Sequence, residues 1–343
     1  MVQTITETLL TGAHPPESLV KGTLKLRGSH SIPNSSAYPD LDTKGYQVVK
    51  GVISREKSAE YVDRMYKWLE SFGTGFKFDD KSTWHIDQLP AFHRGGLYNR
   101  YGVGHEQFVW DIRAEENLIN EFAKIWGTDE LLVSFDGINI TLPLPAEELE
   151  GQRSKPWPHV DQSPNRQYKH CIQGIMNLEE NGPKDGGLKV LEGSIQYYNE
   201  FFEEFKNEMP KEGWTWNDAH FYNEKHLKWF ENKGCKWIKA EAEPGDLILW
   251  DSRSIHYGAL TEGDKPRLAT YVCYKPASDL QPEMKEVRKI AAEQYISTTH
   301  DPLMFRMTGS KIDPHAMENE RLEPSPKPIL TERMQQLAGL KSY

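Results

Sequence analysis

Residues 157–162 read Trp-Pro-His-Val-Asp-Gln, and the interpretation of the whole chain depends on this stretch. We interpret it as a short strand. In a strand every second side chain points to the same face, so His159 and Asp161 are predicted to lie side by side. An imidazole next to a carboxylate is a pair that binds metal ions. The stretch therefore supplies two ligands of a predicted metal site.

A third ligand is predicted far downstream. Residues 244–256 read Pro-Gly-Asp-Leu-Ile-Leu-Trp-Asp-Ser-Arg-Ser-Ile-His. The Pro-Gly-Asp segment predicts a tight turn that leads into the apolar strand Leu247–Trp250, and His256 lies just beyond that strand. Two histidines and one carboxylate form the ligand set of non-haem iron(II) oxygenases, but zinc accepts the same residue types. The ligands alone therefore leave the metal open.

Arg267 favours iron over zinc. It lies eleven residues after His256 and begins the apolar strand Leu268–Tyr274. A guanidinium that points into a barrel binds a carboxylate through two parallel hydrogen bonds. A dicarboxylic 2-oxo acid would then chelate iron at one end and meet Arg267 at the other.

These motifs, in this order, resemble the phytanoyl-CoA dioxygenase-like family. The set consists of His159-x-Asp161, residues 187–194, the turn at 244–246, His256 and Arg267. The resemblance covers about residues 40–280 and implies a double-stranded β-helix. It implies that the two histidines and Asp161 bind Fe(II), and that Arg267 binds the far carboxylate of 2-oxoglutarate. It further implies O2 as co-substrate, succinate and CO2 as products, and oxidation of an unactivated C–H bond, with hydroxylation as the default outcome and desaturation or oxidative cyclisation as alternatives.

Further contacts to 2-oxoglutarate are predicted on the strand faces that line the barrel. The candidates are Asn139, Gln173 and Asn177. Family members often carry Ser two residues after the distal histidine, where this chain has Gly258. Thr270 or Tyr271 is the candidate replacement for that serine.

A second His-x-Asp-Gln pattern occurs at residues 85–88. We do not interpret it as a metal site, because no β-branched run leads into it. Pro90 also follows closely, and proline disfavours a central strand.

The pattern of short strands and turn signals predicts a mainly β, double-stranded β-helix (jelly-roll or cupin-like) core with flanking α-helices. We expect a single oxygenase domain over residues 1–343, with its core at about 131–276 and a helical insertion at 195–234. An arm at 1–40 precedes the core, and a helix and tail follow at 277–343.

Composition limits the partners. The net charge of −10 argues against a nucleic-acid surface or an anionic membrane surface, and no apolar run is long enough for a membrane span. No signal peptide is recognised, and the three cysteines have no metal-like spacing, so a reducing, cytoplasmic setting is expected. The expected partner is a small-molecule substrate, and the oligomeric state is left open.

Two alternative functions are kept. A metal-dependent hydrolase or isomerase on a cupin-like barrel would not require Arg267 to point at the metal. A catalytically silent binding module is suggested only by Gly258, and the intact ligands argue against it.

Overall fold

The computed structural model describes residues 37–93, 95–149, 156–215, 219–308 and 320–343. Most of the predicted arm lies outside these ranges. Within them, no helix is long and apolar enough to cross a membrane.

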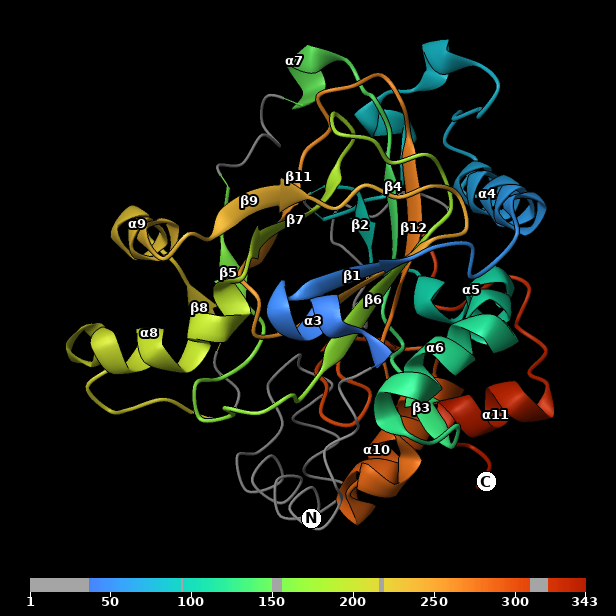
Figure 1. Cartoon of the computed structure of the whole chain (residues 1–343). Coiled ribbons are helices and arrows are strands. Elements are labelled where there is room, and N and C mark those ends of the chain that lie inside the picture. Colours follow the sequence, from blue (N-terminus) through green and yellow to red (C-terminus); the bar gives the residue numbers. More distant parts are fainter. Residues whose placement is uncertain (1–36, 94, 150–155, 216–218, 309–319) are drawn as a thin grey trace.

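Two antiparallel sheets stack on each other at the centre of the molecule (Figure 1). One has six strands in the order β1-β10-β6-β12-β4-β2, and the other has five in the order β8-β5-β11-β7-β9. From β4 to β7 and from β9 to β12, successive strands alternate between the two sheets, as in a jelly roll, so the predicted double-stranded β-helix is confirmed. The strands of the two sheets are β1 (Tyr46–Val49), β2 (Leu97–Tyr98), β4 (Ile138–Thr141), β5 (His159–Val160), β6 (Ile172–Asn177), β7 (Gly187–Glu192), β8 (His220–Phe221), β9 (Lys236–Lys239), β10 (Leu247–Asp251), β11 (His256–Ala259) and β12 (Arg267–Val272).

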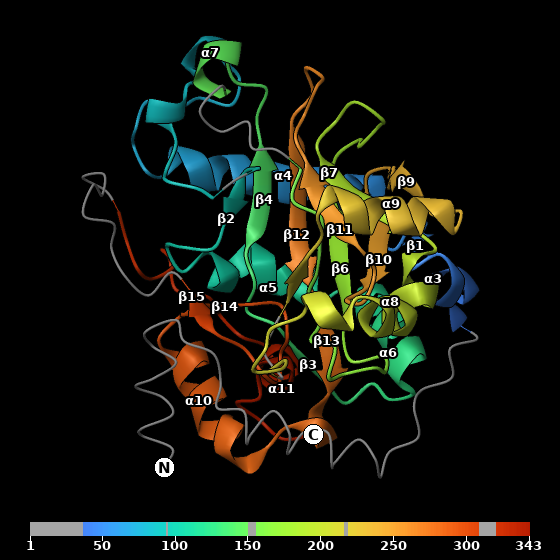
Figure 2. The ribbon, with the colours of Figure 1, turned by 90° about the vertical axis from the view of Figure 1, so that its left-hand side faces the viewer.

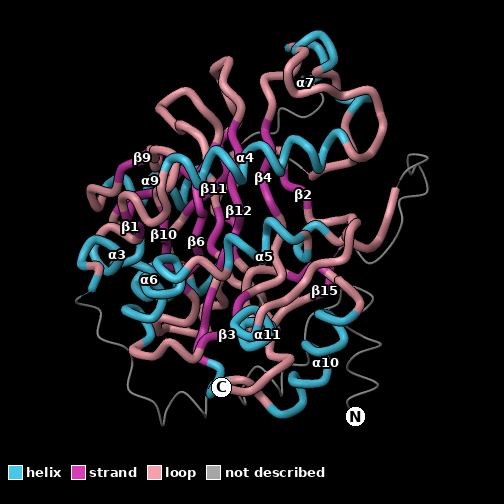
Figure 3. Tube along the Cα trace, turned by 90° about the vertical axis from the view of Figure 1, so that its right-hand side faces the viewer, coloured by secondary structure: helices cyan, strands magenta, loops and turns pink. Residues whose placement is uncertain are grey.

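Helices cover the outer faces of both sheets. Figure 3 shows α4, α5 and α6 over the six-stranded sheet, and Figure 2 shows α8 and α9 over the five-stranded sheet. Two short strand pairs, β3 with β13 and β14 with β15, extend the core towards α10 and α11. These elements are α3 (Pro39–Thr43), α4 (Arg55–Glu70), α5 (Gln107–Arg113), α6 (Glu116–Trp126), β3 (Leu131–Val133), α7 (Ala146–Leu149), α8 (Tyr198–Glu204), α9 (Glu224–Asn232), β13 (Tyr274–Pro276), α10 (Pro282–Glu293), β14 (Ser297–Thr298), β15 (Met307–Thr308) and α11 (Glu332–Ala338).

Strand β10 explains why the sequence after the Pro-Gly-Asp turn is continuously apolar. Leu247 and Leu249 pack into the large cluster formed with the helices. Ile248 and Trp250 point the other way, into the cluster between the two sheets. Because successive strand residues face opposite sides, a strand that is covered on both faces must be apolar throughout.

The predicted helical insertion at 195–234 is only partly helical. It holds α8 and α9, but it also holds β8, which pairs with β5. His159 lies opposite Phe221, and Val160 lies opposite His220. The missed strand has only two residues, and its partner lies about 60 residues earlier in the chain, so local periodicity gives no signal for it.

The turn that begins β10 depends on Gly245. Its φ of 92° lies in the left-handed region, and a Cβ atom there would collide with the backbone carbonyl oxygen of Ile53. The side chain of Asp246 then fixes the turn, accepting hydrogen bonds from the backbone N–H groups of Glu243 at 2.7 Å and Gly51 at 2.9 Å.

Gly245→Ala is expected to destabilise the fold more than Gly51→Ala. Gly51 also has a positive φ, of 63°, but a Cβ atom there would meet nothing within 4 Å. We therefore expect a loss of about 1 kcal/mol for Gly51→Ala, from backbone strain alone. The added collision should raise the loss to roughly 2 kcal/mol or more for Gly245→Ala. Urea unfolding of both variants measures the difference, and equal losses would contradict the role given to the turn.

Candidate metal centre

The pairing of β5 with β11 brings the two predicted histidine ligands together. His159 and His256 are direct partners in this antiparallel pair, and their ring centroids are 4.4 Å apart. Asp161 lies just beyond the end of β5, where its backbone N–H donates to the carbonyl of Ser252 at 3.0 Å. This backbone contact holds Asp161 one residue past the strand, with its side chain beside that of His159.

The donor atoms of the three side chains converge. Nε2 of His159 lies 3.3 Å from Oδ1 of Asp161, and Nε2 of His256 lies 3.3 Å from Oδ2 of Asp161. All three residues offer a ligand atom within 4.8 Å of the others. Metal–ligand bonds of about 2.1 Å at right angles put neighbouring donors roughly 3 Å apart. The three side chains therefore fit a shared metal ion.

Each histidine is held in the orientation that metal binding requires. Nδ1 of His159 lies 3.1 Å from the carbonyl oxygen of Trp157, and Nδ1 of His256 lies 2.9 Å from that of Ser254. A carbonyl can only accept, so each Nδ1 carries the proton. The lone pair of each Nε2 is then free to face the metal position.

Asp161 is an ionised carboxylate in this setting. Burial by itself would raise its pKa, but before a cation binds, positive charge on His159 and hydrogen bonds donated by His159 and His256 hold the pKa well below its ordinary value, and a bound cation would replace that charge. Gln173 also donates from Nε2 to Oδ2 of Asp161 at 2.8 Å. Both effects favour the charged form that binds a cation.

The three ligands open into a cavity of about 410 Å³ between the two sheets. Arg267 lines the same cavity and is only 5% exposed. Gly187 leaves room for it, because a Cβ atom at Gly187 would lie 3.2 Å from Nε of Arg267. The structure therefore brings the metal ligands and the predicted carboxylate-binding arginine to one hollow.

The remaining predicted contacts divide into two groups. Gln173 and Asn139 line the cavity, but Asn139 uses its Nδ2 to hold the backbone carbonyl of Gly95 at 2.6 Å. Asn177 is not among the cavity-lining residues. Its Nδ2 donates to the carbonyls of Glu179 and Glu243, at 2.6 and 3.0 Å. Asn177 lies at the strand end, where these hydrogen bonds hold two loops, and its contact with 2-oxoglutarate stays a prediction.

Thr270 and Tyr271 were the two candidates to replace the serine that family members often carry at the position of Gly258. Of the two, Tyr271 lines the cavity. Gly258 lines the cavity as well, and a Cβ atom there would meet nothing within 4 Å. The second His-x-Asp-Gln pattern lies elsewhere: His85 binds Glu148, with Nδ1 2.6 Å from Oε1.

Two charged residues of the cavity were missed by sequence reasoning. Asp136 lies in the strand region that begins at Leu131, and Arg306 lies in the segment at 277–343 that was expected to hold only a helix and tail after the core. Neither stands at a recognisable motif spacing. The two residues reach the cavity wall only because β14 and β15 pack back against the core.

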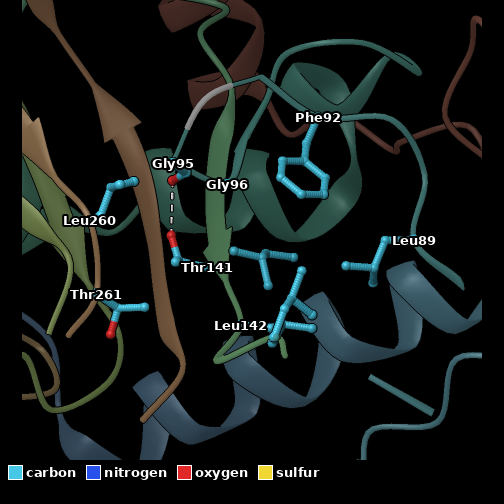
Figure 4. Close-up of a pocket in the computed structure, with 10 residues that line it drawn as sticks. Leu89, Phe92, Gly95, Gly96, Thr141, Leu142, Leu260 and Thr261 are labelled. Carbon is cyan, nitrogen blue, oxygen red and sulfur yellow. Dashed lines mark hydrogen bonds between the residues drawn. The ribbon is translucent and has the colours of Figure 1, made fainter. Parts of the chain in front are cut away.

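A second, smaller pocket of about 40 Å³ adjoins the cavity at Gly95. Figure 4 shows Leu89, Phe92 and Leu142 around it, and the hydrogen bond between Thr141 and the carbonyl of Gly95. Among the residues that the structure describes, no ionisable group lines this pocket. The chemistry therefore belongs to the larger cavity.

Comparison with known proteins identifies the family. The family model described as Phytanoyl-CoA dioxygenase (PhyH) matches residues 41–269. The chain is 41% identical over 265 residues to Ava biosynthesis cluster protein O of Aspergillus versicolor, covering 77% of this chain and 84% of that protein. It is 21% identical over 300 residues to a putative phytanoyl-CoA dioxygenase of Dictyostelium discoideum, covering 77% of this chain and 82% of that protein.

Solved structures with related folds were also found. The non-haem alpha-ketoglutarate-dependent epimerase SnoN from nogalamycin biosynthesis has a TM-score of 0.48 at 14% identity, covering 86% of this chain and 94% of its own. EctD from S. alaskensis with bound Fe has a TM-score of 0.47 at 14% identity, covering 73% of this chain and 79% of its own.

The jelly roll and its two-histidine, one-carboxylate site define the class as a non-haem iron oxygenase that uses 2-oxoglutarate. Within this class, the chain belongs to the phytanoyl-CoA dioxygenase family.

Gln173→Met is expected to weaken metal binding by about 10- to 100-fold, because a hydrogen bond that orients a ligating carboxylate is lost while the side-chain length is kept. Asn177→Ala is the matched control. It lies on the same strand but outside the cavity, so its metal affinity should equal that of the wild type. Titration with Mn(II), followed by electron paramagnetic resonance, measures both affinities. Wild-type affinity in Gln173→Met would contradict the positioning role.

Proposed function

We propose that this protein uses Fe(II), 2-oxoglutarate and O2 to oxidise an unactivated C–H bond of a small organic substrate, releasing succinate and CO2. Hydroxylation is the default outcome, and desaturation or oxidative cyclisation are the variants. The observation that carries the proposal is that Arg267 lines the same cavity as His159, Asp161 and His256. A metal-dependent hydrolase would not require a buried arginine at this place.

In this proposal the two histidines and Asp161 hold iron, and Gln173 keeps the carboxylate in its orientation. When bound, the iron and 2-oxoglutarate together activate O2. The guanidinium of Arg267 holds the far carboxylate of 2-oxoglutarate through charge-assisted hydrogen bonds.

The walls of the cavity serve the same chemistry. Ile175, Leu188 and Trp250 present apolar surface, which limits the access of water to the reacting centre. Trp157 stacks on His159, with the ring centroids 4.3 Å apart and the planes 12° from parallel. This contact restricts rotation of the ligand.

Two other cationic residues of the core, Arg253 and Lys275, already have carboxylate partners. Arg253 binds Asp251 through Nε and Nη2, at 2.9 and 2.8 Å. Lys275 is fully buried and paired with Asp301 at 3.0 Å. Neither lines the cavity. This supports Arg267 as the 2-oxoglutarate anchor.

The three cysteines are buried free thiols, and the sulfur atoms of Cys171 and Cys273 lie 3.2 Å apart. Few cysteines without disulfides are typical of a reducing compartment, and we propose a cytoplasmic location.

Arg267→Ala is expected to raise the KM for 2-oxoglutarate by about 10- to 100-fold, the loss expected when charge-assisted hydrogen bonds are removed. The readout is the succinate formed from 2-oxoglutarate in the presence of Fe(II) and O2. This conversion proceeds slowly even when the organic substrate is absent, so the assay does not require the substrate to be known. Arg253→Lys is the control, because this second arginine lies outside the cavity, and its KM should stay within about twofold of wild type. An unchanged KM in Arg267→Ala would exclude Arg267 as the anchor.

A further inference from the structure

Two oppositely charged side chains in the cavity have no place in the chemistry above. Asp136 and Arg306 both line the cavity that holds the metal ligands. They come from separate parts of the chain: Asp136 lies between β3 and β4, and Arg306 directly precedes β15. Neither belongs to the ligand set, and neither was needed to place 2-oxoglutarate.

The carboxylate of Asp136 has no cationic partner among the described residues. Its one recorded hydrogen bond comes from the backbone N–H of Gly137, at 2.7 Å to Oδ1. Burial raises the pKa of this carboxyl, although the amide of Gly137 and the charges of His300 and Arg113 act in the opposite direction. Asp136 is half-buried, and a partly desolvated carboxylate without a counter-ion is destabilised unless something supplies the missing charge.

Arg113 lies near Asp136, but its guanidinium binds other groups. It is fully buried and donates hydrogen bonds to two backbone carbonyls, those of Gly104 and of Asp136 itself. The distance from Nη2 of Arg113 to the carbonyl oxygen of Asp136 is 2.7 Å. The backbone of Asp136 is therefore fixed at the cavity wall, and the guanidinium hydrogen bonds of Arg113 go to carbonyls and not to its carboxylate.

Arg306 is held in a similar way. Its backbone N–H donates to Oγ1 of Thr299 at 3.0 Å, and its carbonyl accepts from the backbone N–H of Thr299 at 3.0 Å. The side chain is half-buried, and within the described ranges no hydrogen bond or ion pair is recorded for its guanidinium. These backbone hydrogen bonds fix Arg306 at the cavity wall, and its guanidinium has no recorded partner among the described residues.

The two residues also do not neutralise each other. No ion pair within 4.0 Å joins Asp136 and Arg306, although they line one hollow of about 410 Å³. A purely structural pair of opposite charges at this place would be expected to close into a salt bridge. Because no salt bridge joins them, both side chains are available to a ligand that carries one positive or N–H-donating group and one negative or accepting group.

We propose that Asp136 and Arg306 are the substrate anchors of this oxygenase, and that the substrate is dipolar. A basic or N–H-bearing nitrogen meets Asp136, and a carboxylate or carbonyl oxygen meets Arg306. This inference rests on the proposed function and adds the substrate class to it. The anchors also orient the substrate, since two fixed contacts of opposite sign determine which C–H bond faces the metal.

The test uses four small probes that share one branched carbon chain. Leucine carries both charges, 3-methylbutylamine only the cation, 4-methylpentanoate only the anion, and 3-methylbutan-1-ol neither. Wild-type protein is loaded with Mn(II) and saturating 2-oxoglutarate, and the proton relaxation of each probe is measured by NMR. Bound Mn(II) accelerates the relaxation of any probe that enters the cavity. A His256→Ala sample with the same total Mn(II) gives the background from metal outside the site.

We expect the relaxation of leucine and of the two singly charged probes to be enhanced at least threefold over that of the alcohol. Asp136→Asn should abolish the excess for the amine and leave the excess for 4-methylpentanoate. Arg306→Gln should do the reverse. Leucine should lose part of its excess in each variant.

Charged probes that relax no faster than the alcohol in the wild type would overturn the proposal, whether or not the variants fold. So would charge preferences that persist in both variants. The protons of 2-oxoglutarate provide a separate readout in the same samples. If Mn(II) in the wild type does not relax them, the proposed function itself fails, and that result is distinct from failure of the anchors.

Discussion

The site depends on one pair of residues in one strand register. Because β5 pairs with β11 so that His159 lies opposite His256, both imidazoles face the cavity between the sheets. A shift of β5 by one residue would turn Val160 inward, and Val160 now packs with the aromatic residues of the helical insertion. Burial of Val160 on the outer side therefore helps to hold the register that assembles the metal centre.

The sequence predicts the parts of the site that follow from local pattern. His159, Asp161, His256 and Arg267 stand next to recognisable strands and turns, and the structure brings all four to one cavity. The continuous apolar run of β10 likewise predicts a strand covered on both sides.

What the sequence does not predict is set by contacts between distant segments. β8 becomes a strand only because β5 offers an edge to it. Asn177 has the same residue type and strand face as a cavity-lining residue, but loop carbonyls bind it at the strand end. Asp136 and Arg306 meet the cavity only after the C-terminal segment folds back on the core. None of these three outcomes has a local sequence signal.

The most direct test of the account is an anaerobic titration of the wild-type protein with Fe(II) and then with 2-oxoglutarate, followed by visible absorption. If His159, Asp161 and His256 hold iron next to Arg267, a weak charge-transfer band of the iron–2-oxoglutarate chelate will appear and saturate at one equivalent per chain. Iron bound at one equivalent per chain without such a band would contradict the central claim that this cavity binds iron and 2-oxoglutarate together.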